Sequence, residues 1–185
     1  MKILHIDSSG RLSNSLSRKL TSYMITKLKQ KTQKKVIYRD IGSGHGLAYV
    51  NNNIAEALFI PDNERSNLQK EELKPSDEVI KEALDSDIWV IGIPVYNFSM
   101  PATFKTWADM LARLKVTFQY NENGPEGLLK NKKVFIIVTS GGTEVGSEID
   151  FLTPWLRHYM KFIGIEDLTI IQPNEHSVDI AVESL

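Results

Sequence analysis

Cysteine is absent from this 185-residue chain. Its absence excludes disulfide bonds, thiolate metal sites and every mechanism that uses a cysteine nucleophile. The chain also lacks an excess of charge of either sign, because its formal net charge is −1. A nearly neutral chain offers no broad field that attracts nucleic acid or an anionic membrane surface. We therefore expect no nucleic-acid partner, and any small anion has to be bound by local groups.

Long hydrophobic runs are missing as well. No apolar run approaches the roughly 20 residues that a membrane-spanning helix needs, so we expect no membrane partner. The N-terminal residues read as an alternating strand that contains the charged Lys2 and Asp7, and not as a secretion signal, which predicts a cytoplasmic protein. The four histidines are scattered along the chain, and this scatter argues against a metal cluster, so we expect no metal.

Short apolar runs of strand length alternate with segments of helical periodicity. The expected strands cover residues 3–6, 36–38, 88–93, 134–138 and 168–171, and the expected helices lie around residues 16–28, 76–84, 101–112 and 152–163. Residues 42–75 read mostly as a surface excursion with one short helix near residues 54–59, after which Ser76 caps the next helix. The alternation predicts an α/β fold in which a doubly wound, five-stranded parallel sheet carries helices on both faces, as a single domain over residues 1–185.

In sheets of this kind, ligands bind beyond the carboxyl ends of the strands. The loops that follow residues 6, 93 and 138 are therefore the candidate site. The first loop, residues 8–17, is rich in hydroxyls and leads into a helix N-terminus, where unpaired N–H groups and the helix dipole favour a phosphate. It has neither the Gly-Lys-Ser/Thr ending of a Walker loop nor a Gly-x-Gly-x-x-Gly pattern. The alternative is that Ser15 and Ser17 only cap the helix, with the other serines in a solvated turn.

The second loop, residues 94–101, places Tyr96, Asn97 and Phe98 between two prolines. Such a stiff aromatic wall suits a flat ligand; the alternative is that the two rings simply pack the edge of the domain. The third loop, residues 139–142, contains adjacent glycines, which either let the backbone approach a ligand closely or form an ordinary turn. Because all three loops follow strands of one parallel sheet, together they predict a site for a phosphorylated, flat aromatic ligand.

Several sequence motifs resemble those of one enzyme family. They are Pro94-Val95-Tyr96-Asn97-Phe98, the longer run from Val116-Thr117-Phe118 through Tyr120 to Glu122-Asn123-Gly124-Pro125-Glu126-Gly127-Leu128, then Lys132-Lys133, the turn at residues 139–142, and Phe162-Ile163-Gly164-Ile165. In these motifs the chain is similar to the FMN-dependent NADH–quinone oxidoreductases, also called FMN-dependent azoreductases, and the resemblance extends from residue 1 to about residue 171. It implies a flavodoxin-like fold, non-covalently bound FMN, NADH or NADPH as hydride donor, a quinone or azo compound as acceptor, and a homodimer with the flavin near the subunit interface.

The resemblance also implies roles for individual residues. The FMN phosphate is surrounded by Ser9, Ser15, Leu16 and Ser17. The isoalloxazine ring lies against Pro94, Val95, Tyr96, Asn97 and Phe98, and its polar edge against Thr139, Ser140, Gly141 and Gly142. Tyr120 and Phe162 contribute to the substrate pocket. No catalytic side chain is implied, because the flavin carries the chemistry, and we expect the N–H groups of Gly141 and Gly142 to stabilise the charge that reduced FMN gains near its pyrimidine edge.

The chain departs from the family pattern at several positions. Val95 stands where methionine is common, Thr139 replaces the usual serine, and Ser140 lies where relatives carry arginine. Glu144 occupies a position where relatives often have histidine, so no catalytic role is assigned to it. The region of residues 42–75 and the C-terminus are shorter than usual, which leaves substrate shape and dimer contacts open.

Three other functions share parts of this pattern. A flavodoxin-type electron carrier is usually strongly acidic, which steers it toward basic partners, whereas this chain is nearly neutral. A phosphodiesterase-type hydrolase is the second, because some relatives have been labelled acyl-carrier-protein phosphodiesterases; it needs a nucleophile or a base pair, and neither stands out. A flavin-binding regulator without turnover is the third, and the sequence leaves it open.

Overall fold

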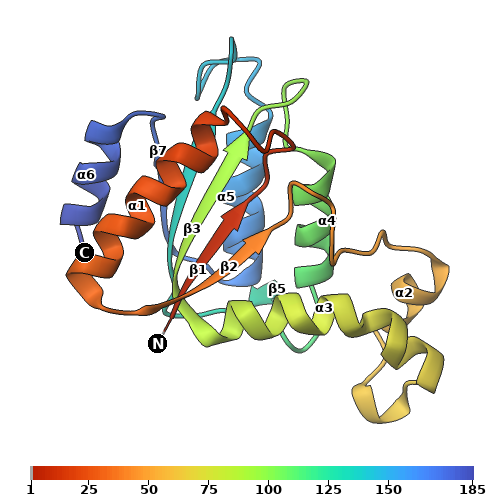
Figure 1. The fold of residues 1–185 in the computed structure, drawn as a ribbon. Helices are drawn as coiled ribbons and strands as arrows, with labels where there is room; N and C mark the ends of the chain where they lie inside the picture. The colour runs from red at the N-terminus through yellow and green to blue at the C-terminus, as the bar shows by residue number, and fades with distance from the viewer. Residues whose placement is uncertain (1) are drawn as a thin grey trace.

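A five-stranded parallel sheet forms the centre of the computed structural model, which describes residues 2–185 (Figure 1). Its strands are β1 (Lys2–Asp7), β2 (Lys35–Asp40), β3 (Ser86–Pro94), β6 (Lys133–Thr139) and β7 (Asp167–Ile171), in the spatial order β2-β1-β3-β6-β7. Each neighbouring pair is parallel. The predicted doubly wound sheet is confirmed, and its strand order reverses between β1 and β3, which is where such sheets bind ligands.

Helices cover both faces of the sheet. Two of them, α1 (Leu16–Thr32) and α6 (Glu175–Glu183), lie side by side on one face, and α3 (Asn67–Asp85), α4 (Ala102–Leu111) and α5 (Leu152–Ile163) cover the other (Figure 1). Successive side chains of a strand point to opposite faces. In β3, Val90 therefore packs toward α1, whereas Trp89 and Ile91 pack toward α3, α4 and α5. Burial on both faces explains the near-continuous apolar runs from which these strands are predicted.

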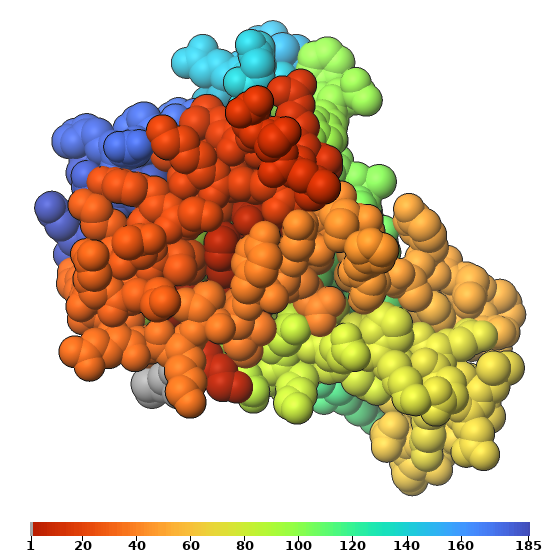
Figure 2. All heavy atoms as spheres, in the orientation of Figure 1, coloured from red at the N-terminus to blue at the C-terminus, as the bar shows by residue number. Residues whose placement is uncertain are grey.

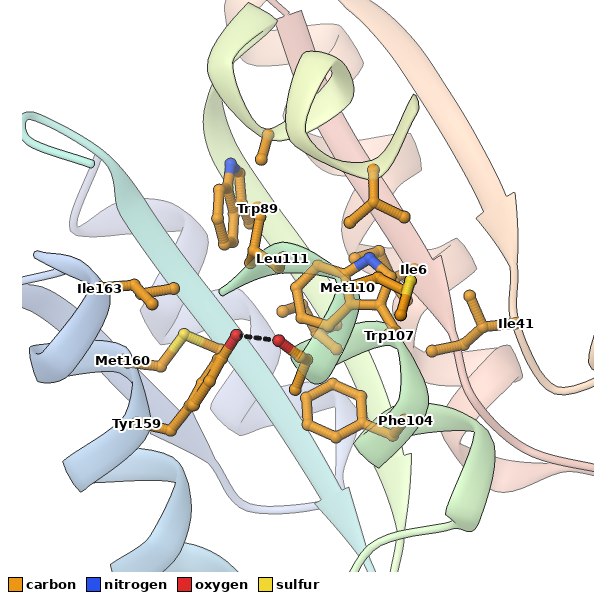
Figure 3. Packing of buried hydrophobic residues seen from close by; sticks show 14 of the residues in the cluster. Ile6, Ile41, Trp89, Phe104, Trp107, Met110, Leu111, Tyr159, Met160 and Ile163 are labelled. Carbon is orange, nitrogen blue, oxygen red and sulfur yellow. Dashed lines mark hydrogen bonds between the residues drawn. The ribbon is translucent and has the colours of Figure 1, made fainter. Parts of the chain in front are cut away.

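The core beneath α4 and α5 contains a cluster of aromatic rings (Figure 3). The rings of Trp89 and Trp107 meet edge to face with centroids 6.2 Å apart, and Phe104 lies 5.4 Å from Trp107. On α5 the buried Tyr159 donates its hydroxyl hydrogen to the carbonyl of Ala108 in α4 over 2.5 Å. The loops that follow β3 and β6 lead into the N-terminal ends of α4 and α5, so this packing also fixes those two loops.

The start of α3 differs from the sequence-based expectation. This helix begins at Asn67, so the prediction that Ser76 caps it is wrong. The cap is Ser66, whose Oγ accepts the N–H of Gln69 over 3.2 Å while Gln69 Oε1 accepts the N–H of Ser66 over 2.9 Å, a capping box. Pro75 lies inside the helix, where proline costs about 3 kcal/mol relative to alanine. Burial of Leu73 and of the apolar stripe that follows it offsets this cost.

The predicted short helix near residues 54–59 is present as α2 (Asn52–Ala57). Three elements are not indicated by the sequence: the hairpin of β4 (Phe118–Asn121) and β5 (Gly124–Gly127), the 3₁₀ turn η1 (Asp62–Glu64), and α6. The segment from residue 50 to residue 70 projects from the body of the molecule (Figure 2). No helix within residues 2–185 combines the length and the hydropathy that crossing a membrane requires.

Candidate functional site

The three predicted loops meet at the carboxyl edge of the sheet (top of Figure 1). There they line a cleft of about 320 Å³. The lining residues are Ser9, Arg11, Asn14, Ser15 and Leu16 from the first loop, Pro94, Val95 and Tyr96 from the second, and Thr139, Ser140 and Gly141 from the third. Of the residues expected to bind the cofactor, four lie within two positions of a lining residue but do not line the cleft themselves: Ser17, Asn97, Phe98 and Gly142. Arg11 and Asn14 join the lining although no sequence signal singled them out within the loop.

The first loop brings unpaired backbone donors to the cleft. Ser15 caps α1, its Oγ lying 3.5 Å from the N–H nitrogen of Arg18 and 3.2 Å from Ser17 Oγ. The first N–H groups of a helix have no carbonyl within the helix to bind, and the dipole makes this end positive. No acidic residue occupies the first turn of α1, so nothing there competes with an anion. This end of α1 is therefore suited to hold a phosphate.

The second loop presents its aromatic residues in a tight turn. Tyr96 and Ser99 exchange backbone hydrogen bonds of 2.9 and 3.1 Å, and the turn residues Asn97 and Phe98 have φ values of 49° and 68°. A positive φ on a residue as bulky as phenylalanine is strained, and such strain concentrates at functional sites. Tyr96 is 38% exposed and Phe98 53% exposed, so neither ring is buried as packing of the domain edge would require. The N–H of Val95 donates to the carbonyl of Thr139 over 2.7 Å, which ties this loop to the third.

The hydroxyl of Ser140 binds two backbone N–H groups at the end of the third loop. Ser140 Oγ accepts the N–H of Gly142 over 3.1 Å and the N–H of Thr143 over 2.7 Å. The N–H of Gly142 is thus engaged within the loop, and the expectation that it donates to a reduced flavin is not supported by this geometry. Gly141 lines the cleft, and a Cβ added to it would meet no atom within 4 Å, so a ligand can approach its backbone closely.

A carboxylate that the sequence did not single out holds the segment between this loop and α5. Asp150 is 5% exposed; its Oδ1 accepts the N–H groups of Leu152 and Thr153, and its Oδ2 accepts the N–H of Gly146 over 2.8 Å and the hydroxyl of Thr153. Burial raises the pKa of Asp150, but the hydrogen bonds from Gly146, Thr153 and Leu152 outweigh it and hold the pKa below its ordinary value. The signal that could have found this residue is an aspartate just before a helix start.

A second carboxylate lies under the first loop, at the end of β1. Asp7 is buried; Thr21 donates to its Oδ1 over 2.7 Å and Tyr38 donates to its Oδ2 over 3.1 Å. The ring of His5 is also buried, with Nε2 3.5 Å from Asp7 Oδ1. Burial raises the pKa of Asp7, but its neighbours, of which His5 has the largest effect, bring this pKa below its ordinary value. Burial and the negative charge of Asp7 raise the pKa of Tyr38 to about 12. Asp7 therefore stays ionised at neutral pH.

Tyr120 and Phe162 lie away from the cleft. They pack around Phe118, with ring centroids 5.8 Å and 4.5 Å from it, on β4 and at the C-terminal end of α5. Because α5 runs back from the carboxyl edge of the sheet toward the amino ends of the strands, Phe162 cannot reach the cleft of its own chain. Their expected place in a substrate pocket requires a second subunit and stays a prediction.

A larger hollow, of about 500 Å³, lies at the other end of α4. Its walls come from residues 58–62, Arg65, Asp77 and residues 113–116. None of these residues follows the carboxyl end of a strand of the large sheet, and the hydroxyl-rich loop is absent from its lining. We therefore assign the ligand site to the smaller cleft. No group of three or more histidine, aspartate or glutamate side chains suited to a metal ion occurs within residues 2–185.

The cleft fits a phosphorylated flat ring system in several respects. Its volume falls within the roughly 300–1,000 Å³ of typical cofactor sites. It combines a helix N-terminus for the phosphate, the aromatic residue Tyr96 for a ring, and the open backbone of Gly141 for a polar edge. These are the groups that FMN needs.

Comparison with known proteins identifies the family of this chain. A family model described as "Flavodoxin-like fold" matches residues 1–183. "FMN-dependent NADH:quinone oxidoreductase 1" of Colwellia psychrerythraea is 44% identical over 171 residues, which are 92% of this chain and 88% of the relative. The chain belongs to the flavodoxin-like family of FMN-dependent NADH:quinone oxidoreductases. The protein of the same name from Trichormus variabilis is 40% identical over 185 residues, covering 100% of this chain and 87% of the relative.

Solved structures agree with this family assignment at the level of the fold. An azoreductase of Bacillus anthracis superposes with a TM-score of 0.84 at 22% identity, covering 100% of this chain and 96% of that chain. An FMN-dependent NADH-azoreductase of Bacillus anthracis, solved in complex with FMN, superposes with a TM-score of 0.83 at 19% identity, covering 100% and 97% of the two chains. The flavodoxin-like fold implied by the sequence motifs is thus confirmed.

Proposed function

We propose that this protein is an FMN-dependent oxidoreductase that passes two electrons from NADH or NADPH, through bound FMN, to a quinone or an azo compound. The observation that carries the proposal is the convergence of the three loops in one cleft, in a chain whose relatives bear the name FMN-dependent NADH:quinone oxidoreductase. FMN, when bound, supplies the hydride-accepting and electron-donating chemistry; the protein supplies binding, orientation and electrostatics.

Each loop has its own task in this proposal. The start of α1, with Ser9, Ser15, Leu16 and Ser17, binds the phosphate. The second loop holds one side of the ring through the backbone of Val95 and the face of Tyr96. Thr139, Ser140 and the N–H of Gly141 face the polar edge of the ring, where a preorganised donor stabilises developing negative charge.

The composition of the cleft speaks against the hydrolase alternative. Its lining contains serine and threonine hydroxyls but no histidine, aspartate or glutamate, so no general base stands beside a nucleophile. An electron carrier is distinguished by experiment, because a carrier does not oxidise a nicotinamide cofactor on its own.

We further propose that the protein acts in the cytoplasm as a homodimer. Exposed apolar side chains gather along the carboxyl edge of the sheet, among them Leu12, Phe98, Ile149 and Phe151. Contact with a second subunit would cover such residues, and it would bring Tyr120 and Phe162 of one chain to the cleft of another. Light scattering during size-exclusion chromatography tests this: a monomer at micromolar concentration contradicts it.

The reaction is tested with purified protein reconstituted with FMN under anaerobic conditions. Addition of NADH should bleach the flavin absorbance, and a quinone added next should restore it in stoichiometric amount. If NADH leaves the spectrum of the bound flavin unchanged, and NADPH does as well, the protein is not this enzyme.

A matched pair of cap variants tests the phosphate site. Ser15→Asp keeps a good helix cap but places a negative charge where the phosphate should lie. Two charges 4 Å apart in water repel by about 1 kcal/mol, so against a dianion we expect about thirtyfold weaker FMN binding. Ser66→Asp makes the same change at the cap of α3 and should leave FMN affinity unchanged. If the two variants changed FMN affinity equally, the assignment of the phosphate to the first loop would be wrong.

A further inference from the structure

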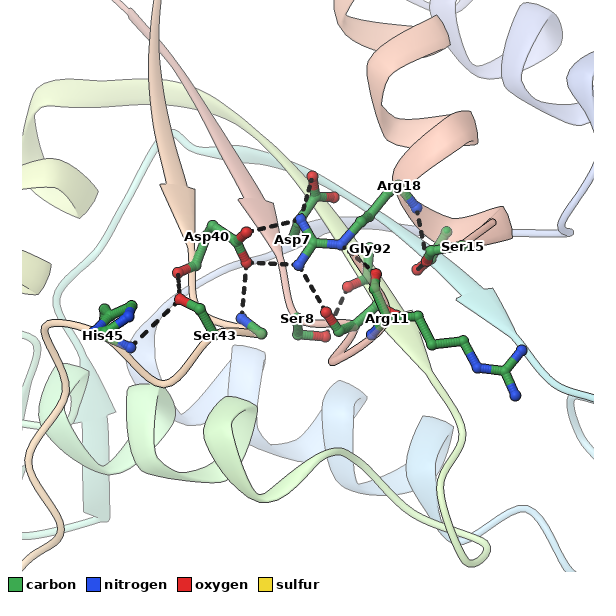
Figure 4. A network of polar contacts seen from close by, with 12 residues as sticks. Asp7, Ser8, Arg11, Ser15, Arg18, Asp40, Ser43, His45 and Gly92 are labelled. Atoms are coloured by element: carbon green, nitrogen blue, oxygen red, sulfur yellow. Dashed lines mark hydrogen bonds and ion pairs between the residues drawn. The ribbon is translucent and has the colours of Figure 1, made fainter. Parts of the chain in front are cut away.

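The side chain of one arginine binds the backbone of the first loop. Arg18 lies in the first turns of α1, and its side chain reaches back to the loop that precedes the helix (Figure 4). Its Nη2 donates to the carbonyl of Ser9 over 2.7 Å, and its Nε donates to the carbonyl of Arg11 over 2.9 Å. Ser9 and Arg11 line the cleft, whereas Arg18 lines a neighbouring hollow together with Asn14, Ser15 and Leu16. The two carbonyls are thus bound by a side chain that is not part of the cleft wall.

The arginine is itself held by the end of β2. Asp40 accepts Nη1 of Arg18 on Oδ2 over 2.9 Å and Nη2 on Oδ1 over 2.7 Å, a bidentate pair. Asp40 Oδ1 also accepts the N–H of Gly42 over 3.0 Å. Nη1 donates in addition to the hydroxyl of Tyr38 over 3.2 Å. The Arg18 side chain is only 14% exposed, so this arrangement is sheltered from solvent.

The donor count decides what Arg18 does. A guanidinium has five N–H donors. Here one goes to Arg11, one to Ser9, one to Tyr38 and two to Asp40. No donor is left for a ligand, and the charge of the guanidinium is paired with a carboxylate. Arg18 is therefore not built to bind the phosphate directly.

We propose that Arg18 and Asp40 are positioning residues that set the phosphate affinity of the cleft without touching the phosphate. By drawing the carbonyls of Ser9 and Arg11 to the rear of the loop, the pair keeps electronegative oxygens out of the cleft and leaves the N–H groups to face it. This inference rests on the proposed function, because it concerns the site to which FMN is assigned.

Two variants separate positioning from simple charge. Asp40→Asn removes a negative charge near the site, so charge alone predicts tighter FMN binding, whereas loss of the bidentate pair predicts weaker binding. Arg18→Lys keeps the charge but loses the planar fork, so charge alone predicts no change. We expect each variant to weaken FMN binding about tenfold, the effect of losing one charge-assisted hydrogen bond.

Riboflavin, which lacks the phosphate, is the second ligand in the experiment. Dissociation constants for FMN and riboflavin are measured by quenching of flavin fluorescence on each variant. The ratio of the two constants should change about tenfold through FMN alone, with riboflavin affinity within about twofold of wild type. General damage to the fold would weaken both ligands together.

A neighbouring ion pair, between Arg39 of β2 and Glu82 of α3, provides the control. Arg39 forms the same kind of bidentate contact with Glu82, at 2.5 and 2.8 Å, and its side chain is 11% exposed, but it does not contact the first loop. Arg39→Gln should lower thermal stability and leave the FMN-to-riboflavin ratio unchanged. The positioning role is overturned if Asp40→Asn and Arg18→Lys keep the wild-type ratio, or if Asp40→Asn binds FMN more tightly. Failure of the wild-type protein to bind either flavin would instead overturn the proposed function.

Discussion

Gly42, just beyond β2, leaves room for the first loop only because it has no side chain. A Cβ at this position would lie 2.0 Å from the carbonyl oxygen of Ser9, 2.6 Å from its carbonyl carbon and 2.7 Å from Nη2 of Arg18. Ordinary contact begins near 3.4 Å, so the backbone of the first loop would have to retreat by about 1.4 Å. Gly42 does not have a positive φ, so alanine is allowed by the backbone itself and the conflict is purely steric.

We expect Gly42→Ala to be destabilised by about 3 kcal/mol, the upper part of the range for overpacking, because backbone and not a flexible side chain is in the way. For a chain of this size that lowers Tm by about 6–12 °C. A loop displaced by this distance should also bind FMN at least about tenfold more weakly. Differential scanning fluorimetry and an FMN titration measure the two effects.

Gly10→Ala is the matched control in the same loop. The nearest atoms to a Cβ on Gly10 are 4.0 Å away, and its φ is not positive, so its stability should stay within about 0.5 kcal/mol of wild type. If Gly42→Ala melts and binds FMN like the wild-type protein, the loop is not seated against residue 42 as described.

Three further results are expected. Asp150→Ala should lose about 2 kcal/mol of stability in urea unfolding, because it removes the acceptor for the N–H groups of Gly146 and Thr153; a loss below 0.5 kcal/mol would contradict its role. The depressed pKa of Asp150 means that its contribution is complete above its ordinary pKa of 3.8 and is lost as pH falls through the lower folded value, so wild type should lose more stability than Asp150→Asn between pH 5 and pH 3 in paired urea titrations. Phe98→Gly should gain about 1 kcal/mol of stability by relieving a positive φ, measured by urea unfolding; unchanged stability would mean that the turn is not strained.

The position of the site could be predicted from the sequence because the topology of a parallel sheet determines it. Parallel strands end at one edge, so the loops after residues 6, 93 and 138 had to come together once the strands were assigned. Burial of both faces of β3 and β6 made those strands easy to find. The glycine at residue 164, with φ of 102°, ends α5 where the sequence predicts.

What the sequence could not reveal depends on contacts between distant residues or on packing that overrides local preference. Arg18 and Asp40 are far apart in the chain and meet only because β2 lies beside β1. The early start of α3 is hidden by Pro75, which reads as a helix breaker although burial of the helix outweighs its cost. The backbone of Gly127 in β5 lies so close to that of Gly164 at the end of α5 that a Cβ on Gly127 would clash, and no local pattern in the sequence predicts this contact.

The most direct test of the account is the structure of the protein crystallised with FMN. We expect the phosphate to lie within hydrogen-bonding distance of the N–H groups at the start of α1, with the ring against Val95 and Tyr96 and its polar edge toward Gly141. A flavin bound instead in the larger hollow beside Arg65 and Arg113, or a cleft that remains empty at saturating FMN, would contradict it.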